Sequence, residues 1–377
     1  MRITIRRSVA FMGLALVAGV SAEAAARLDD WIRLGIPFRH TPDYDRDLKY
    51  RDWFGVRGKP NGRYRRWHLD STGFRGPDVA RARTAGCTRT MLLGASETLG
   101  LYEPDGQEYS AQLQDSLRNR GCYEVLNAGV AGMGLKAIIR YWEDYGAAFK
   151  PDFVIVYPSP IFYLSTNEST WPPVLRGPEP SSELPFRPRL IETMHNVWAT
   201  PDFIQVHRVD RWISRDRAGK PADWMFRSIP ADRLNGFMTD LDSLVRSIRA
   251  RRATPVVMTH AIRFGNPVDP RDAFELKGWN QFTPRATAET MLAFEHAAAT
   301  AMRADAARNH IALVDLDSAL TGRRELFGDA IHFLQGGSAI VAGMLARVLN
   351  PSPAEDDHSI IPAGSPGRVS GSSPRNR

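Results

Sequence analysis

Residues 88–98 read TRTMLLGASET, and this stretch decides the fold. Its first half is short and mostly apolar, which is typical of a strand buried on both faces of a sheet. Gly94 then begins a tight turn, and Ser96 stands on it where a helix would start. A serine on the turn that leaves a parallel strand lies in the crevice where open α/β sheets bind ligands. The N–H groups of a helix start suit a developing oxyanion there, although a serine that only caps the helix is the commoner use of this position.

Strand and helix patterns alternate along the chain from about residue 86 to residue 350. After Thr90–Leu93, the strand candidates are Val125–Asn127, Phe153–Tyr157, Thr254–Thr259 and Ile311–Asp315. Helical patterns lie between them at Tyr109–Arg120, Leu135–Phe149, Ala231–Arg251 and Ala286–Asn309. This alternation predicts an α/β domain, residues 86–350, whose parallel sheet is covered by helices on both faces.

Three segments depart from this pattern. Residues 28–85 have no sustained period and are expected to pack on the main domain as an irregular lead-in. Residues 158–253 form a long insertion after the third strand, and connections of this length usually carry function or their own small structure. We expect a lid or a substrate-binding insertion there. Residues 351–377 are rich in Pro, Ser and Gly, which predicts a disordered tail.

Two further motifs follow other strands at the same expected edge of the sheet. Residues 127–134 read NAGVAGMG, in which Gly132 can direct its N–H into the crevice; a glycine-rich turn without a ligand is the alternative. Residues 328–333 read GDAIHF. Asp329 can reach Nδ1 of His332 and hold the ring so that Nε2 faces a serine hydroxyl. Capping of the helix that follows is the competing role for Asp329.

The amino terminus has the three parts of an export signal. A basic start precedes an apolar run from Val9 to Val20, and the small-residue segment 21–26 follows. The run is shorter than the roughly 20 residues that span a bilayer, unless the segment extends to Leu28. Residues 1–27 are therefore expected to be a cleaved signal peptide or an uncleaved membrane anchor. Either places the domain in the periplasm or outside the cell.

Composition and cysteine content agree with an exported globular protein. The 377 residues have 43% hydrophobic and 24% charged side chains, which excludes a disordered chain and a polytopic membrane protein. The net charge of +7 includes no basic run interleaved with aromatics, so no nucleic-acid partner is expected. Cys87 and Cys122 each stand just before a predicted strand. If those strands are neighbours, an oxidising compartment favours a disulfide between them; two free thiols are the alternative.

Taken together, the serine after the first strand, Asn-x-Gly-x-x-Gly after the second and Asp-x-x-His after the last resemble the SGNH (GDSL-type) hydrolase family. The resemblance covers about residues 86–350. Residues 70–76, DSTGFRG, also look like the Asn-x-x-Gly-Phe-Arg-Gly segment ahead of the domain in many exported members. The resemblance implies a three-layer, flavodoxin-like parallel sheet, and it implies no metal or organic cofactor.

The resemblance also implies roles for individual residues. Ser96 would be the nucleophile, His332 its general base and Asp329 the group that orients His332. The backbone N–H groups of Ser96 and Gly132 would form part of the oxyanion hole. Active relatives transfer acyl groups through a covalent acyl-serine, which water then hydrolyses.

Two positions depart from the family pattern. Ala95 stands where the family has the Asp of Gly-Asp-Ser, a residue taken to support the turn. After the third strand the chain reads PSPIF at 158–162 and lacks the Asn whose side chain donates to the oxyanion. Ser159 and Asn167 are the candidates to replace it, and losing one such donor typically costs about 10² to 10³ in rate.

Three functions remain open from the sequence. The first is an exported serine esterase that removes O-acyl groups, O-acetyl among them, from a carbohydrate or cell-envelope polymer. The second is an O-acyltransferase in polysaccharide modification, in which a sugar hydroxyl accepts the acyl group. The third is a catalytically impaired relative that binds a glycan or a partner through the insertion, which the missing Asn favours. A hydrogen bond between Ser96 and His332 would favour the first two. Asn127 and His260, which lie at strand ends, are further candidate substrate contacts.

Overall fold

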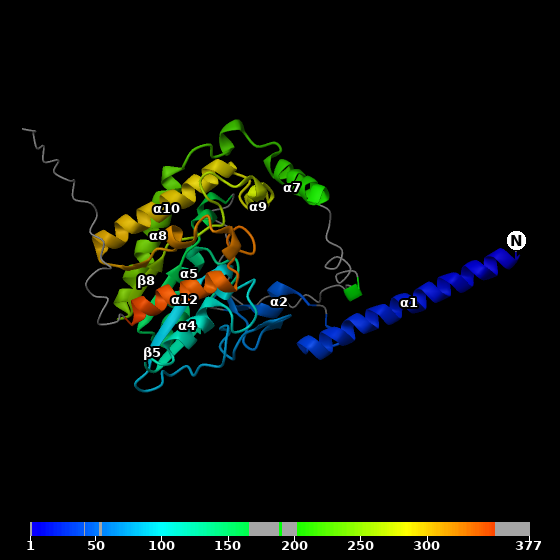
Figure 1. Ribbon diagram of the computed structural model, residues 1–377, viewed down its shortest axis with the longest axis horizontal. Helices are drawn as coiled ribbons and strands as arrows, with labels where there is room; N and C mark the ends of the chain where they lie inside the picture. Colours follow the sequence, from blue (N-terminus) through cyan, green and yellow to red (C-terminus); the bar gives the residue numbers. More distant parts are fainter. Residues whose placement is uncertain (1, 41, 53–54, 166–187, 191–201, 351–377) are drawn as a thin grey trace, which may run out of the picture.

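The central feature of the molecule is a five-stranded parallel sheet with the strand order β6-β5-β7-β8-β9. The structure is a computed structural model, and it describes residues 2–40, 42–52, 55–165, 188–190 and 202–350 (Figure 1). The strands are β5 (Thr88–Gly94), β6 (Tyr123–Asn127), β7 (Phe153–Tyr157), β8 (Thr254–Met258) and β9 (Ala312–Val314). Because the first of them lies between the second and the third, the sheet has the flavodoxin-like order. The predicted fold class is confirmed.

Helices cover both faces of this sheet (Figure 1). One face packs against α4 (Tyr109–Leu117), α11 (Leu316–Leu320) and α12 (Gln335–Leu349). The other packs against α5 (Leu135–Asp144), α8 (Ala231–Ala250) and α10 (Ala288–Asn309). Neighbouring strand residues alternate between the layers, so that Leu92 faces α4 while Met91 and Leu93 face the opposite core. Burial on both faces explains why these strands read as continuous apolar runs.

Shorter elements fill the connections. They are α3 (Ser96–Leu99), α7 (Asp202–Arg217), α9 (Ala273–Asn280) and the 3₁₀ turns Gly146–Phe149, Pro160–Leu164, Ala222–Trp224, Pro270–Asp272 and Arg324–Leu326. The helix expected over 135–149 is divided, because the chain leaves the helical conformation at Tyr145. Of the predicted insertion, 166–187 and 191–201 lie outside the described residues, as does the predicted tail at 351–377.

The lead-in is folded into very short elements. These are α2 (Tyr44–Leu48) and two antiparallel hairpins, β1 (Lys49–Asp52) with β2 (Gly55–Gly58) and β3 (Arg63–Tyr64) with β4 (Trp67–His68). Arg75, which follows them, is 4% exposed. Its backbone N–H donates to Asn127 O at 3.0 Å, and its guanidinium donates to Leu99 O at 2.6 Å and Glu103 O at 3.0 Å. The lead-in therefore fixes the segments that follow β5 and β6.

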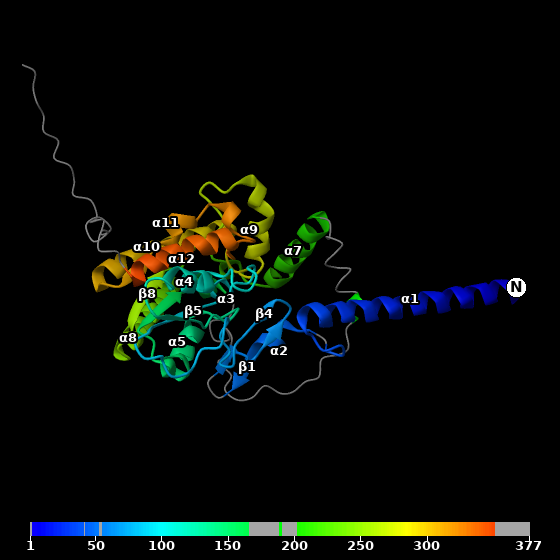
Figure 2. The ribbon, with the colours of Figure 1, turned by 60° about the horizontal axis from the view of Figure 1, so that its bottom comes forward.

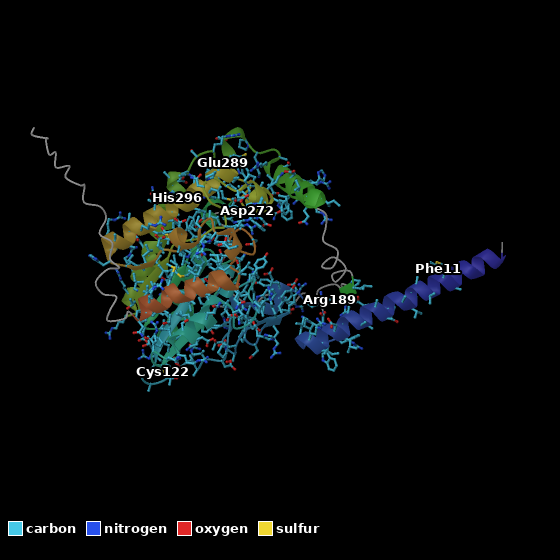
Figure 3. The ribbon with its side chains drawn as sticks, viewed as in Figure 1. Phe11, Cys122, Arg189, Asp272, Glu289 and His296 are labelled. Atoms are coloured by element: carbon cyan, nitrogen blue, oxygen red, sulfur yellow. A yellow bond between two sulfur atoms is a disulfide. The ribbon has the colours of Figure 1, made fainter. Side chains whose placement is uncertain are left out.

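The amino-terminal helix α1 (Arg2–Leu34) extends away from the domain (Figures 1 and 2). It passes the length and composition test for a membrane span over Ala10–Leu34. Toward its carboxyl end, Glu23 accepts hydrogen bonds from the backbone N–H groups of Arg189 (2.8 Å) and Leu190 (2.7 Å). Asp30 forms an ion pair with the Arg189 side chain. Figure 3 shows Arg189 beside the domain end of α1 and Phe11 near the free end.

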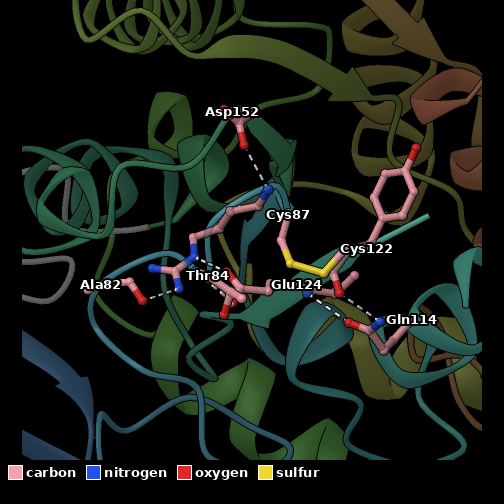
Figure 4. Close-up of a disulfide and its surroundings, with 10 residues drawn as sticks. Ala82, Thr84, Cys87, Gln114, Cys122, Glu124 and Asp152 are labelled. Atoms are coloured by element: carbon pink, nitrogen blue, oxygen red, sulfur yellow. Dashed lines mark hydrogen bonds and ion pairs between the residues drawn. A yellow bond between two sulfur atoms is a disulfide. The ribbon is translucent and has the colours of Figure 1, made fainter.

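The amino ends of β5 and β6 are joined by a disulfide between Cys87 and Cys122 (Figure 4). Two residues along β5, the fully buried Arg89 forms an ion pair with Glu124 of β6, Nε to Oε2 at 2.7 Å. Its backbone N–H donates to Asp152 Oδ2 at 2.8 Å. This edge of the sheet is held by a covalent bond and by buried charge.

Candidate active site

Ser96 is held at the carboxyl end of β5 by a turn that only glycine permits. A Cβ atom on Gly94 would lie 2.0 Å from Oγ1 of Thr98, which no side chain can tolerate. The carbonyl oxygen of Ala95 accepts from the Leu99 N–H at 3.0 Å and closes the first turn of α3. The backbone turn therefore forms without the Asp of the family pattern.

Ser96, His332 and Asp329 form one chain of hydrogen bonds. Oγ of Ser96 is 2.8 Å from Nε2 of His332, and Nδ1 of His332 is 2.7 Å from Oδ2 of Asp329. The other oxygen of Asp329 accepts from the backbone N–H groups of Ile331 (3.0 Å) and His332 (2.9 Å). Asp329 thus orients the ring and fixes its own turn, but it does not cap the following helix α12, whose N-cap is Leu334 without a side-chain hydrogen bond.

The charged forms of His332 and Asp329 stabilise each other. Burial lowers the pKa of His332, but the hydrogen bond to Asp329 and its charge, with smaller contributions from Glu97 and Glu103, raise it above its ordinary value. Burial raises the pKa of Asp329, but its hydrogen bond to His332 and the charge of that ring leave the pKa below its ordinary value. Asp329 is therefore ionised at neutral pH and favours a protonated His332.

Two candidate backbone donors belong to residues at the same cavity. Gly132 occupies a turn closed by a hydrogen bond from Met133 N to Val130 O at 3.1 Å, and its φ of 79° is the left-handed value that favours glycine. Both Gly132 and Ser96 line the cavity. Among the hydrogen bonds of the described residues, neither amide is engaged. Both N–H groups are free to bind an oxyanion.

Asn127 does not line the cavity in front of Ser96. It is 1% exposed, and its amide nitrogen donates to Thr98 O at 2.8 Å and to Ser110 Oγ at 2.9 Å. Its amide oxygen accepts from Gly129 N at 3.0 Å. These partners enclose the side chain. It therefore stabilises the segments that follow β5 and β6 and does not reach the cavity.

Ser159 lies on the cavity wall, directly after β7. It is 2% exposed, and its hydroxyl has no hydrogen-bond partner in the described structure. A buried hydroxyl without a partner has its hydrogen available for a group that enters the cavity. Asn167, the other candidate replacement for the family Asn, lies outside the described residues.

His260 does not line the cavity either. It is 2% exposed, with Nδ1 2.9 Å from Glu295 Oε2 and Nε2 3.2 Å from Glu97 Oε1. Sequence reasoning missed both glutamates. The position of Glu97 next to Ser96 was the available signal, whereas nothing local to Glu295 connects it with residue 97 or 260.

The cavity in front of Ser96 has a volume of about 830 Å³. Part of its wall comes from the predicted insertion, since α7 contributes Gln205, Arg208 and Val209. Aromatic and apolar side chains line other parts of it: Ile161, Phe162, Phe274, Trp279, Phe282 and Ile331. No group of three or more His, Cys, Asp or Glu side chains suited to a metal ion occurs among the described residues.

No protein-family model and no curated protein matches the chain. Among solved structures, it is similar to Axe2, an acetylxylan esterase from Geobacillus stearothermophilus, with 16% identity, a TM-score of 0.40, and coverage of 70% of this chain and 95% of that one. It is similar to TesA, with 15% identity, a TM-score of 0.41 and coverage of 70% and 99%. It is also similar to a lipolytic protein of the G-D-S-L family from Desulfitobacterium hafniense, with 13% identity, a TM-score of 0.37 and coverage of 69% and 99%. Because these TM-scores are below 0.5, the function proposed below rests on this chain's own contacts.

Proposed function

We propose that the protein is a serine esterase that removes O-acyl groups from a hydroxyl-bearing substrate through an acyl-serine. The observation that carries this proposal is the hydrogen-bonded chain Ser96–His332–Asp329 at the wall of the large cavity. A serine, an imidazole and a carboxylate in this order are the groups that nucleophilic acyl transfer requires. The same geometry counts against the catalytically impaired alternative.

In the proposed reaction, Ser96 Oγ attacks the ester carbonyl carbon while its hydrogen passes to Nε2 of His332. Asp329 stabilises the imidazolium through the Nδ1 hydrogen bond. His332 then protonates the leaving alcohol, and the acyl group stays on Ser96. Water attacks the acyl-serine with His332 as base, which releases the acid and restores the hydroxyl.

The oxyanion would be bound by the backbone N–H groups of Ser96 and Gly132. We assign the third donor to the Ser159 hydroxyl, which replaces the Asn of the family pattern. Its support is the position of Ser159 on the same cavity wall, together with its lack of any partner. A hydroxyl that is not already donating can be directed at a developing negative charge.

The cavity suits an acylated carbohydrate. Its volume of about 830 Å³ exceeds what a short acyl group fills, so it has room for part of the alcohol moiety as well. Rings such as Phe274 and Trp279 offer apolar faces for a sugar, and Gln205 and Arg208 offer donors for its hydroxyls. If the acceptor is a sugar hydroxyl in place of water, the same residues make an O-acyltransferase, which is the second candidate function.

Labelling with a fluorophosphonate probe tests the nucleophile. The full chain in detergent is expected to be labelled, and Ser96→Ala and His332→Ala are expected to abolish labelling. Ser116→Ala, an exposed serine on α4, is the control and should label like the wild type. A folded wild type that is not labelled would overturn the proposal. Mass spectrometry of acetylated oligosaccharide incubated with the enzyme then separates release of free acid from transfer to a second sugar.

We also propose that α1 is retained as an anchor, with the domain exported. Cleavage at the small residues near 24–26 would remove Glu23, which holds the backbone of Arg189 and Leu190. The side chains farther toward the amino end are apolar and exposed, including Phe11 (73%), Leu16 (69%) and Val20 (63%). A bilayer would cover this surface, with the basic start on the cytoplasmic side.

Mass spectrometry of the membrane-extracted protein tests retention. The expected result is a peptide that spans residues 21–34 uncut, in a protein that resists alkaline extraction from the membrane. A mature amino terminus at residues 24–27 in a soluble fraction would contradict the proposal.

A further inference from the structure

A buried cluster that the mechanism above does not use lies directly behind Ser96. Glu97 comes from α3, His260 from the loop after β8 and Glu295 from α10. Each of the three is 3% exposed or less. His260 lies between the two carboxylates, with its ring nitrogens 2.9 Å from Glu295 Oε2 and 3.2 Å from Glu97 Oε1. We call these three residues the Glu–His–Glu cluster.

The charge states within the cluster follow from this geometry. Burial lowers the pKa of His260, but the charge of Glu295 and the hydrogen bonds to both carboxylates raise it to about 10. Burial raises the pKa of Glu97, but its hydrogen bond to His260 and the charge of His332 leave it below the ordinary value. At neutral pH, Glu97 is therefore a carboxylate, and the protonated His260 ring compensates its charge on the side away from Ser96.

The second oxygen of Glu97 faces the nucleophile. Oγ of Ser96 lies 3.2 Å from Glu97 Oε2 and 2.8 Å from His332 Nε2. A hydroxyl has a single hydrogen to donate, so the two groups are alternative acceptors for it. When His332 is neutral, Nε2 accepts that hydrogen. When His332 is protonated, Nε2 becomes a donor to Oγ, and the serine hydrogen turns to Glu97.

We propose that Glu97 is a further catalytic residue, which accepts the Ser96 hydrogen while His332 is protonated and so sets, with Asp329, the pH at which the serine becomes active. The proposal rests on the assignment of Ser96 as nucleophile. Only one proton leaves the site on activation, and it passes from His332 Nε2 to water. The His332 Nε2–H bond breaks as this proton joins water, while the Ser96 O–H bond stays intact and rotates from Glu97 to Nε2.

Burial raises the pKa of Glu103, one of the other titratable groups near these side chains, whereas the nearby tyrosines do not titrate over the relevant pH range. Asp329, Glu103 and Tyr102 are near His332, the Tyr102 ring centroid lying 5.6 Å from that of His332. Burial and the charge of Asp329 raise the pKa of Tyr102 to about 12, and burial raises the pKa values of Tyr109 and Tyr157, which face Glu97. These tyrosines stay neutral, so a change at Glu97 can be read without their titration.

The test is a titration of the His332 ring by ¹⁵N NMR in the full chain, with His332→Gln used to assign the signal. In Glu97→Gln, the titration midpoint of His332 is expected at lower pH than in the wild type, because a negative charge and an acceptor have been removed. The acid limb of kcat/KM for an ester should move in the same direction. At a pH below the wild-type midpoint, kcat/KM of the variant, taken as a fraction of its own plateau value, should then be several-fold higher than the same fraction for the wild type. Glu289→Gln is the matched control, since Glu289 is an exposed glutamate in the first turn of α10, the helix that carries Glu295, and does not line the cavity.

A second variant separates a charge effect from a packing effect. His260→Gln removes the cation that lies between Glu97 and Glu295, so any effect of this variant on the His332 midpoint is expected to act through the charge of Glu97. The double variant Glu97→Gln/His260→Gln should move the midpoint no farther than Glu97→Gln alone. An unchanged or raised midpoint in Glu97→Gln, or additive shifts in the double variant, would overturn the proposal. The NMR titration needs no substrate, so failure of the esterase function would be visible separately, as absent probe labelling.

Discussion

The two edges of the central sheet both bury polar side chains, but the hydrogen-bonding groups of these side chains find partners to different extents. At the amino edge, the five N–H groups of the Arg89 guanidinium meet fixed acceptors, namely Glu124 and the carbonyl oxygens of Ala80, Arg81, Ala82 and Phe149. At the carboxyl edge, the single hydrogen of Ser96 has two acceptors, and the Ser159 hydroxyl has no partner.

This difference distinguishes structural from reactive burial. Where each donor has one fixed acceptor, the side chain has a single arrangement and serves to hold the fold. Where donors and acceptors are unequal in number, a hydrogen can change partner or a ligand can complete the set. The amino edge should therefore respond to substitution in stability, and the carboxyl edge in reaction rate.

The largest effect is expected from Asp329→Asn at the carboxyl edge. The amide no longer favours the Nδ1–H form of His332, and kcat should fall about 10⁴-fold, as loss of the orienting carboxylate does in serine hydrolases. Steady-state kinetics on an activated ester measure this. Asp115→Asn, on the exposed part of α4, serves as the control. A fall of less than tenfold would remove Asp329 from the mechanism.

Arg89→Met tests the amino edge. It leaves the largely buried Glu124 carboxylate and several carbonyl oxygens unpaired, and breaking a buried pair in this way typically costs about 3–5 kcal/mol. Urea unfolding of wild type and variant measures the loss. Arg118→Met, which breaks an exposed pair with Asp115, should cost less than about 1 kcal/mol. Equal losses in the two variants would refute the distinction between the edges.

Ser159→Ala also tests the carboxyl edge, and its expected effect on kcat is smaller than that of Asp329→Asn. If the hydroxyl is the third oxyanion donor, kcat should fall by about 10² to 10³ while KM changes little. Ser165→Ala is the matched comparison, because its hydroxyl is also buried on the cavity wall without a partner but has no assigned role. If both variants keep kcat within a few-fold of the wild type, Ser159 is not a donor to the oxyanion.

The smallest effect concerns the pH dependence of stability at His260. Its pKa is raised to about 10 in the folded protein, against about 6.5 in an unfolded chain. The stability it contributes is therefore complete below pH 6.5 and is lost as pH rises toward 10. The ring ¹⁵N signals of His260 should show no titration between pH 5 and 8 in the folded chain, and titration near 6.5 in urea. Titration of the folded protein near neutral pH would show that the cluster holds no buried cation.

Local patterns were sufficient to predict the sheet, because each buried strand is a short apolar run between helical stretches. The juxtaposition of Ser96 and His332 followed from placing two motifs at one sheet edge. The Glu–His–Glu cluster could not be predicted in this way, because the partners of His260 lie 163 and 35 residues away and depend on helix packing. Asn127 was assigned to the substrate since it follows a strand, but its partners Thr98 and Ser110 enclose it. The hairpins of the lead-in escaped notice because strands of two to four residues show no period.

Helix α7 has a consequence for how the proposed enzyme can diversify. The proposed nucleophile, base and oxyanion donors all follow strands of the sheet, whereas Gln205, Arg208 and Val209 belong to α7, a helix within the long connection between β7 and β8. Changes on α7 can therefore alter which molecules enter before they alter how fast a bond breaks. Variation in this one segment would produce a series of catalysts with the same chemistry and different substrate specificities.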